Sequence, residues 1–265
     1  MELTKSYERV FSPALRGRYS FAEIRNAATA LHGTNPTEFE HLTSVLNGFW
    51  LTLDALTAAG GSKSGIAADL DLAFRQLGWR EAGHETSTHF TLTFSPWPAG
   101  TDPQEPVEFD YTTEGHKVDN YQGRVALDVE WNAKDGNLDR DLANFRALHD
   151  LGVIDVGVII TRHQERTKWA ANYLAAAGDR IRYDTRTEKR IVLLGTTTTT
   201  NMEKLVPKLE RGDAGGCPIL AIALTELCYR AGKGEPSLPS FPGSAAAIPD
   251  PETDSSVVAA EPDED

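Results

Sequence analysis

Acidic and amide side chains gather near the middle of the chain. Asp119 stands before a turn-like segment, 120–123, and polar side chains then recur at every second position: Asp128, Glu130, Asn132 and Lys134. Carboxylate oxygens suit Mg²⁺, which keeps several waters and takes one or two carboxylates together with a substrate phosphate. Bound Mg²⁺ polarises a phosphoryl oxygen and lowers the pKa of its water, and a nearby Lys or amide can orient that water. The pattern therefore predicts metal-assisted chemistry on a phosphate.

A strand over residues 124–134 would position these side chains. Side chains alternate between the two faces of a strand, so the polar set would share one face and Val125, Leu127, Val129 and Trp131 the other. Asp119 would fold back beside the polar face in a hairpin. A solvated strand face is the plain alternative, and two observations weigh against it. The next strand, 153–161, is a near-continuous run of β-branched residues, as in strands buried on both faces, and the acids come as Asp-x-Glu rather than as acid–base pairs.

The remaining elements form an α/β pattern with a mixed sheet. Residues 1–80 are predicted to be helical, because Ser20–Glu23 has the form of a capping box and apolar residues follow at helical spacing. Later segments alternate between strands and helices. The predicted helices are 21–31, 42–56, 66–77, 137–151 and 201–211, and the predicted strands are 89–94, 117–119, 124–134, 153–161, 190–194 and 217–224.

The spacing from Asp119 to Glu130-Trp131-Asn132 resembles the signature of the PD-(D/E)xK nucleases. Three longer stretches are similar to the BglII-like type II restriction endonucleases, and they occur in the expected order: GGSKSGIAADLDLAFRQLGW (60–79), HKVDNYQGRVALDVEWNAKDGNLDRDLANFRALHDLGVIDVGVII (116–160) and KLVPKLERGDAGGCPILAIAL (204–224). The resemblance implies a PD-(D/E)xK core, with a mixed sheet flanked by helices. It also implies a Mg²⁺-dependent endonuclease that cuts palindromic double-stranded DNA as a homodimer.

The resemblance also assigns catalytic residues. Asp119 and Glu130 fall on its metal-ligand positions. Asn132 falls where most of the superfamily has Lys and the BglII-like group has Gln, so it would hold the attacking water. Lys134 lies on the same predicted face and is the alternative source of positive charge. The expected catalytic set is therefore Asp119, Glu130, Asn132 and Lys134.

Side chains that follow the two central strands would meet the DNA. By the resemblance, these segments face the major groove, where Arg pairs with guanine and amides pair with adenine. The loop 60–65 would contact the DNA backbone, although an ordinary helix connection explains it equally well. Plain alternatives also exist for Asn137 as a helix cap and for Arg162 as a strand end. The expected DNA contacts are Lys63, Ser64, Asp135, Asn137, Arg162 and His163.

Charge is distributed unevenly along the 265 residues, whose net charge is −13. Residues 233–265 hold one basic and eight acidic residues with six prolines, and they are predicted to be a disordered acidic tail. The single endonuclease domain would then span 1–232, with a helical part at 1–80 and the catalytic core at 85–228. Residues 162–211 carry eleven basic against six acidic residues, so a local basic face can engage phosphates.

Composition excludes several classes of protein. No apolar run is long enough to span a membrane, and two cysteines cannot make a disulfide framework. The N-terminus lacks the pattern of a secretory signal. We therefore expect a cytoplasmic protein. The resemblance further implies a cognate DNA methyltransferase in the same restriction–modification system, without a stable complex.

Two alternatives to a type II restriction endonuclease stay open. One is a PD-(D/E)xK nuclease that acts in repair or on modified DNA. The other is a sequence-specific DNA-binding protein whose nuclease centre has decayed, because Asn132 replaces the catalytic Lys.

Overall fold

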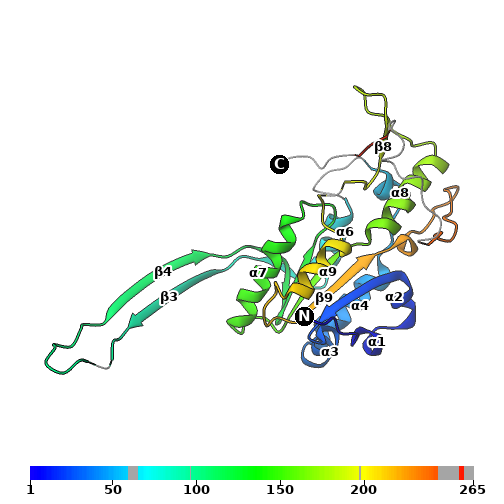
Figure 1. The fold of residues 1–265 in the computed structure, drawn as a ribbon. Helices are drawn as coiled ribbons and strands as arrows, with labels where there is room; N and C mark the ends of the chain where they lie inside the picture. Colours follow the sequence, from blue (N-terminus) through cyan, green and yellow to red (C-terminus); the bar gives the residue numbers. More distant parts are fainter. Residues whose placement is uncertain (59–64, 96, 197, 244–256, 260–265) are drawn as a thin grey trace.

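A six-stranded mixed sheet forms the centre of the computed structural model, which describes residues 1–58, 65–95, 97–196, 198–243 and 257–259 (Figure 1). The strand order is β1-β9-β7-β6-β5-β2. β6, β7 and β9 run parallel, while β1, β5 and β2 join in antiparallel fashion. The strands of this sheet are β1 (Tyr19–Ile24), β2 (Arg80–Ala82), β5 (Val118–Gln122), β6 (Val125–Val129), β7 (Val156–Arg162) and β9 (Ile219–Leu224). The predicted α/β class with a mixed sheet flanked by helices is confirmed.

Helices cover both faces of this sheet. α7 (Gly136–Asp150) and α9 (Met202–Arg211) pack on one face, where their apolar stripes meet Ala126, Ile159 and Ala221. The opposite face carries Leu127, Val158 and Ile222, and its core includes side chains of the other long helices. The further helices are α1 (Tyr7–Val10), α2 (Pro13–Arg18), α3 (Ala27–Thr34), α4 (Pro36–Gly48), α5 (Leu53–Thr57), α6 (Gly65–Gln76), α8 (Gln164–Ala177) and the 3-10 turn η1 (Glu226–Cys228).

Close packing of α7 on the sheet depends on Gly157 of β7. A Cβ built there would lie 2.5 Å from Cδ2 of Phe145, which is fully buried. Any larger residue would push α7 away from the parallel strands. This contact matters because α7 also contributes to the polar site described below.

The sequence predicted a helical N-terminal part, and this prediction is wrong for one segment. Residues 19–24 form β1, which pairs with β9. The capping-box pattern at Ser20–Glu23 fails because the Glu23 carboxylate serves a tertiary contact: it accepts hydrogen bonds from the backbone N–H groups of Ser6 and Ala28. The predicted helix 42–56 is two helices, α4 and α5, and the helix predicted over 66–77 is confirmed as α6.

A long hairpin leaves the body of the molecule (Figure 1). β3 (Glu85–Leu92) and β4 (Val107–Glu114) form a separate two-stranded sheet, of which the sequence pattern indicated only part of β3. Another small sheet joins β8 (Arg190–Val192) to β10 (Val257–Ala259). No helix among the described residues is long and apolar enough to cross a membrane.

The predicted acidic tail lies partly outside the described residues. Its first part contacts the body: Phe241 meets the Trp169 ring edge-on at 5.3 Å, and Leu238 packs against the core. The Tyr229 hydroxyl donates to the carbonyl of Pro236. β10 is a strand that the composition of the tail did not indicate. These contacts tie residues 236–241 to the domain that precedes them.

Candidate active site

Three carboxylates meet where β5 and β6 run side by side. The β5–β6 register pairs Asn120 with Leu127, so the next pair toward the site is Asp119 and Asp128. The backbone N–H of Asp119 donates to Oδ1 of Asp128 at 2.7 Å. Glu130 lies two residues after Asp128, just past the end of β6, and its N–H bonds to the carbonyl of Ile160 in the parallel neighbour β7. Alternation along the strand therefore sets Asp128 and Glu130 on one face.

α7 adds a fourth carboxylate and a cation. Asp141 is 1% exposed and lies in the apolar stripe of α7 that faces the sheet. Nη2 of Arg140 is 2.9 Å from Oδ1 of Asp141 and 3.7 Å from Oε1 of Glu130. The side-chain amide of Asn144 donates to the carbonyl of His116, which ties α7 to the chain entering β5. We call Asp119, Asp128, Glu130 and Asp141 the carboxylate cluster.

Burial and mutual repulsion keep protons on the carboxylate cluster. Burial, followed by repulsion from Asp71, raises the pKa of Asp119 to about 6. Burial and the charges of Asp141 and Asp119 raise the pKa of Asp128 well above its usual value. The pKa of Glu130 is raised by burial and by Asp141, and burial raises that of Asp141 against the opposing pull of Arg140. With all four groups ionised, the cluster would carry more negative charge than Arg140 can balance, and this repulsion favours the protonated forms.

The unpaired oxygens of the cluster fit a hard divalent cation. Oδ2 of Asp128, Oε2 of Glu130 and Oδ2 of Asp141 are buried without a hydrogen-bond partner, a condition that buried polar atoms rarely tolerate. No three such side chains among the described residues are already arranged to hold a metal ion together. A cation would thus take one or two of these carboxylates and fill its shell with water and substrate oxygen, as Mg²⁺ does.

Asn132 does not share the face of the cluster, because β6 ends at Val129 rather than at residue 134. Asn132 has a φ of 56°, in the left-handed region that Asn tolerates better than most residues. Its side-chain oxygen accepts a hydrogen bond of 3.3 Å from Nη2 of Arg162. Arg162 is fully buried at the end of β7 and also donates to Thr199. Both side chains therefore brace the turn that follows β6.

Thr199 and Thr200, at the end of the threonine run, secure the same turn, a role that the sequence did not indicate. The hydroxyls of Thr200 and Thr161 both donate to the carbonyl of Glu130, at 3.0 and 2.8 Å. Ala133 exchanges hydrogen bonds with Thr200 through its N–H and its carbonyl. Since Glu130 belongs to the carboxylate cluster, these hydroxyls fix the backbone that carries one of its side chains.

The predicted DNA contacts lie mostly around the start of α9. Lys134 is exposed, and its backbone forms an isolated antiparallel β-bridge with that of Thr199. Asp135 pairs with Lys204 of α9, and His163 lies 2.8 Å from Glu203. Asn137 lies in the first turn of α7. Arg162 differs from the expectation, because burial holds its guanidinium inside the molecule rather than toward a groove of DNA. Lys63 and Ser64 lie outside the described residues.

Sequence reasoning placed Asp128 among the polar side chains of the strand but not in the catalytic or metal-ligand set, and it did not consider Asp141 or Arg140. The signal for Asp128 was its place opposite Asp119 once the hairpin turn is centred on Gly123. The signal for Asp141 was its spacing with Leu138, Leu142 and Phe145, which puts an acid in a core-facing helical stripe.

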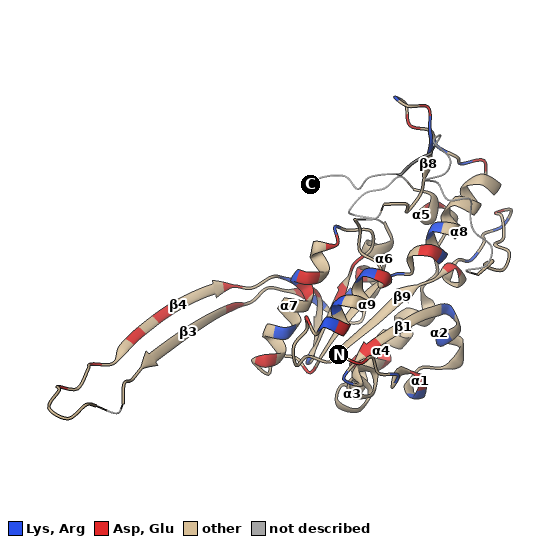
Figure 2. Ribbon diagram, viewed as in Figure 1, with Lys and Arg blue, Asp and Glu red and all other residues tan. Residues whose placement is uncertain are grey.

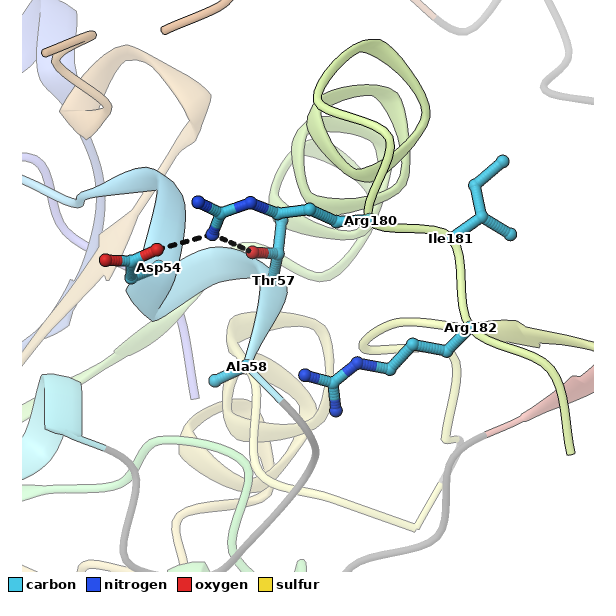
Figure 3. Close-up of a pocket in the computed structure, with 6 residues that line it drawn as sticks. All are labelled: Asp54, Thr57, Ala58, Arg180, Ile181 and Arg182. Atoms are coloured by element: carbon cyan, nitrogen blue, oxygen red, sulfur yellow. Dashed lines mark hydrogen bonds and ion pairs between the residues drawn. The ribbon is translucent and has the colours of Figure 1, made fainter. Parts of the chain in front are cut away.

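A separate pocket of about 410 Å³ lies between α5 and the segment after α8 (Figure 3). Arg180 reaches across it to Asp54 and to the hydroxyl of Thr57, and Arg182 lines another side. None of the carboxylate cluster lines this pocket. The candidate active site is therefore the carboxylate cluster and not this pocket.

Most of the chain matches the model of a known protein family. The family model of restriction endonuclease BglII/BglIII matches residues 19–224, which is more than half of the chain. No curated protein matches the chain. The matched segment runs from the first strand of the central sheet to the last and contains every residue of the carboxylate cluster.

Proposed function

The chain belongs to the BglII/BglIII restriction endonuclease family, and we propose that it cuts palindromic double-stranded DNA as a Mg²⁺-dependent homodimer. Family membership supports a type II restriction endonuclease, a site-specific nuclease that acts on DNA. The metal, the palindrome and the homodimer are the finer parts of the proposal. A two-fold symmetric protein matches a palindromic site in symmetry.

The observation that carries the proposal is the buried carboxylate cluster where β5, β6 and α7 meet. Uncompensated carboxylates are unfavourable in a protein interior, and clustered groups with strongly shifted pKa values are typical of functional sites. A binding-only protein has no need of such a cluster for catalysis, so the presence of all four carboxylates supports an active nuclease rather than a decayed one.

We assign the metal to Asp119 and Asp128, which adjoin each other across β5 and β6, and we retain Glu130 at the same site. Mg²⁺ held there would polarise the scissile phosphate and lower the pKa of a bound water. Glu130 lies two residues beyond Asp128 on the same face, and once a bound cation favours its ionised form it would orient the attacking water or accept its proton. Asp141 and Arg140 hold Glu130 in place.

This assignment changes the predicted roles of two residues. Asn132 contacts Arg162, and Lys134 lies beyond the turn, so in our proposal neither orients the water. Both keep the turn next to Glu130 in shape. Lys134, Asp135, Asn137 and His163 remain the side chains that we propose to meet DNA, because they surround the ends of β6 and β7 near the site. We retain the proposals of a cytoplasmic location and of a cognate methyltransferase without a stable complex.

A digest of plasmid DNA by the purified chain tests the proposed function. We expect discrete fragments with Mg²⁺ and none with EDTA, and their sequenced ends should share one palindrome. Random nicking would favour a repair nuclease. Absence of cleavage on both unmodified and methylated DNA would contradict the proposal and favour the binding-only alternative.

A further inference from the structure

The β3–β4 hairpin has two chemically different faces. Its register pairs Phe90 with Phe109, Leu92 with Val107, and Thr88 with Tyr111. Paired residues of an antiparallel ribbon lie on the same face, so these six side chains share one side with the pair Thr86 and Thr113. No residue on that side is charged. We call these eight residues the apolar face of the hairpin.

The reverse face of the hairpin is acidic. It carries Glu85, Glu108, Asp110 and Glu114 together with His89, whose Nδ1 lies 2.7 Å from Oδ1 of Asp110. Residues 85–114 contain no Lys or Arg, and Figure 2 shows no basic residue along either strand. Repulsion between carboxylates and phosphates therefore makes this hairpin a poor ligand for DNA.

The apolar face is unusually open for a soluble protein. Phe90, Phe109 and Tyr111 are 50%, 51% and 57% exposed, and the centroids of the two phenylalanine rings lie 6.3 Å apart. An isolated two-stranded hairpin is marginally stable in water, and contiguous exposed apolar patches mark interaction sites. The apolar face of the hairpin would therefore be more stable when packed against another surface, whereas the acidic face is suited to solvent.

We propose that the apolar face packs against the same face of a second copy of this chain. The match is one of charge: two uncharged faces meet without like-charge repulsion, and both acidic faces remain in water. Among the described residues of the body, the exposed large apolar side chains are single residues such as Leu72 on α6, Tyr173 on α8 and Leu227 on η1, apart from Leu151 and Val153 in the loop after α7.

Self-pairing also satisfies symmetry. An isologous contact places one patch against itself through a two-fold axis, so a single surface is enough. Aromatic side chains bury about 150–250 Å² each when fully covered, so the exposed halves of three aromatics on two copies remove several hundred Å² of apolar surface. The arm contact deepens the homodimer proposed above, and only its DNA context rests on the proposed function.

Sedimentation velocity of the full chain over a range of concentrations tests the contact. The wild type should be dimeric, and Phe90→Lys/Phe109→Lys should raise the dimer Kd more than about 30-fold, as for the loss of interface hot spots. Thr91→Lys/Thr112→Lys is the matched control, because it adds the same charge to the reverse face and should leave the dimer intact. A monomeric wild type, or a dimer that survives the first pair of changes, would overturn the proposal.

Cysteine scanning covers the case in which lysines disorder the hairpin. Both native cysteines are fully buried, so a short bis-maleimide reports on an introduced one. Thr88→Cys and Phe109→Cys should give covalent dimers, whereas Ser87→Cys and Asp110→Cys should not. The opposite pattern, or no cross-linking at either face, would contradict the contact. A chain that forms these dimers but cuts no DNA leaves the contact standing and refutes only the proposed function.

Discussion

Asp128 is a carboxylate that the protein keeps almost out of solvent beside Asp119, with Glu130 two residues beyond it. In the absence of a cation, such a cluster lowers its free energy by holding protons. The proposed chemistry and the unfavourable clustering of these carboxylates have the same structural cause, because β5, β6 and α7 bring the side chains together.

Asp128→Asn should stabilise the protein at pH 8 in the absence of divalent metal. A carboxyl group whose folded pKa is raised contributes stability that is present below its unfolded pKa, near 4, and is lost as the pH rises through the folded pKa. The amide of the Asp128→Asn variant does not ionise, so the variant does not lose this stability as the pH rises. We expect the melting temperature to rise by at least about 2 °C in a thermal scan. Asp139→Asn, at an exposed residue paired with Lys208, should give no rise.

Mg²⁺ should stabilise the wild type more at pH 8 than at pH 5. The pKa of Asp119 is raised to about 6, and a cation must displace protons from its ligands. Thermal scans with and without Mg²⁺ at both pH values measure this difference. An equal shift at both pH values would mean that the cation binds elsewhere.

At the scale of elements, strong periodicity predicted the pieces that build the site. The helices over 137–151 and 201–211 and the buried strand over 153–161 were predicted from local patterns and are confirmed as α7, α9 and β7. Local pattern failed at β1, where Glu23 serves a tertiary contact, and at β6, whose end is set by the turn at Asn132. The pairing that joins Asp119 to Asp128 depended on register, which no local pattern fixes.

The threonine run offers a test of positioning at this scale. Thr200→Val removes one of two hydroxyls that bond the carbonyl of Glu130. A net loss of about 1 kcal/mol is typical for such a bond and corresponds to a fall of about 2–4 °C in melting temperature. The cleavage rate should fall as well, because the backbone of Glu130 keeps only the hydrogen bond from Thr161. Thr198→Val, at an exposed residue of the same run, serves as the control in both assays, and an equal effect of the two changes would contradict this role.

The whole molecule divides into a body that holds the site, an arm that projects from it and a C-terminal segment that partly packs on the body. The arm was the feature least predictable from sequence, since β4 has no apolar partner layer and its strand pattern is broken by acids. The body followed more closely from sequence because its strands and helices bury their apolar faces against one another.

Two truncations separate the packed part of the C-terminal segment from the rest. Removal of residues 244–265 deletes β10 and its three residue pairs with β8, and it should leave cleavage and melting temperature nearly unchanged. Removal of residues 233–265 also deletes Leu238 and Phe241, which contact the core and Trp169, and should lower the melting temperature by several degrees. Thermal scans of both forms check this difference, and equal stability would show that these contacts contribute nothing.

The most direct test of our account is the single-turnover cleavage of plasmid DNA by Asp128→Asn and Asn132→Ala with saturating Mg²⁺. We predict that Asp128→Asn slows cleavage by at least ~10²-fold, the scale on which lost electrostatic stabilisation of a transition state is measured, while specific DNA binding persists. Asn132→Ala should retain most of the rate. Wild-type cleavage by Asp128→Asn, with loss of activity in Asn132→Ala, would contradict the site that we assign.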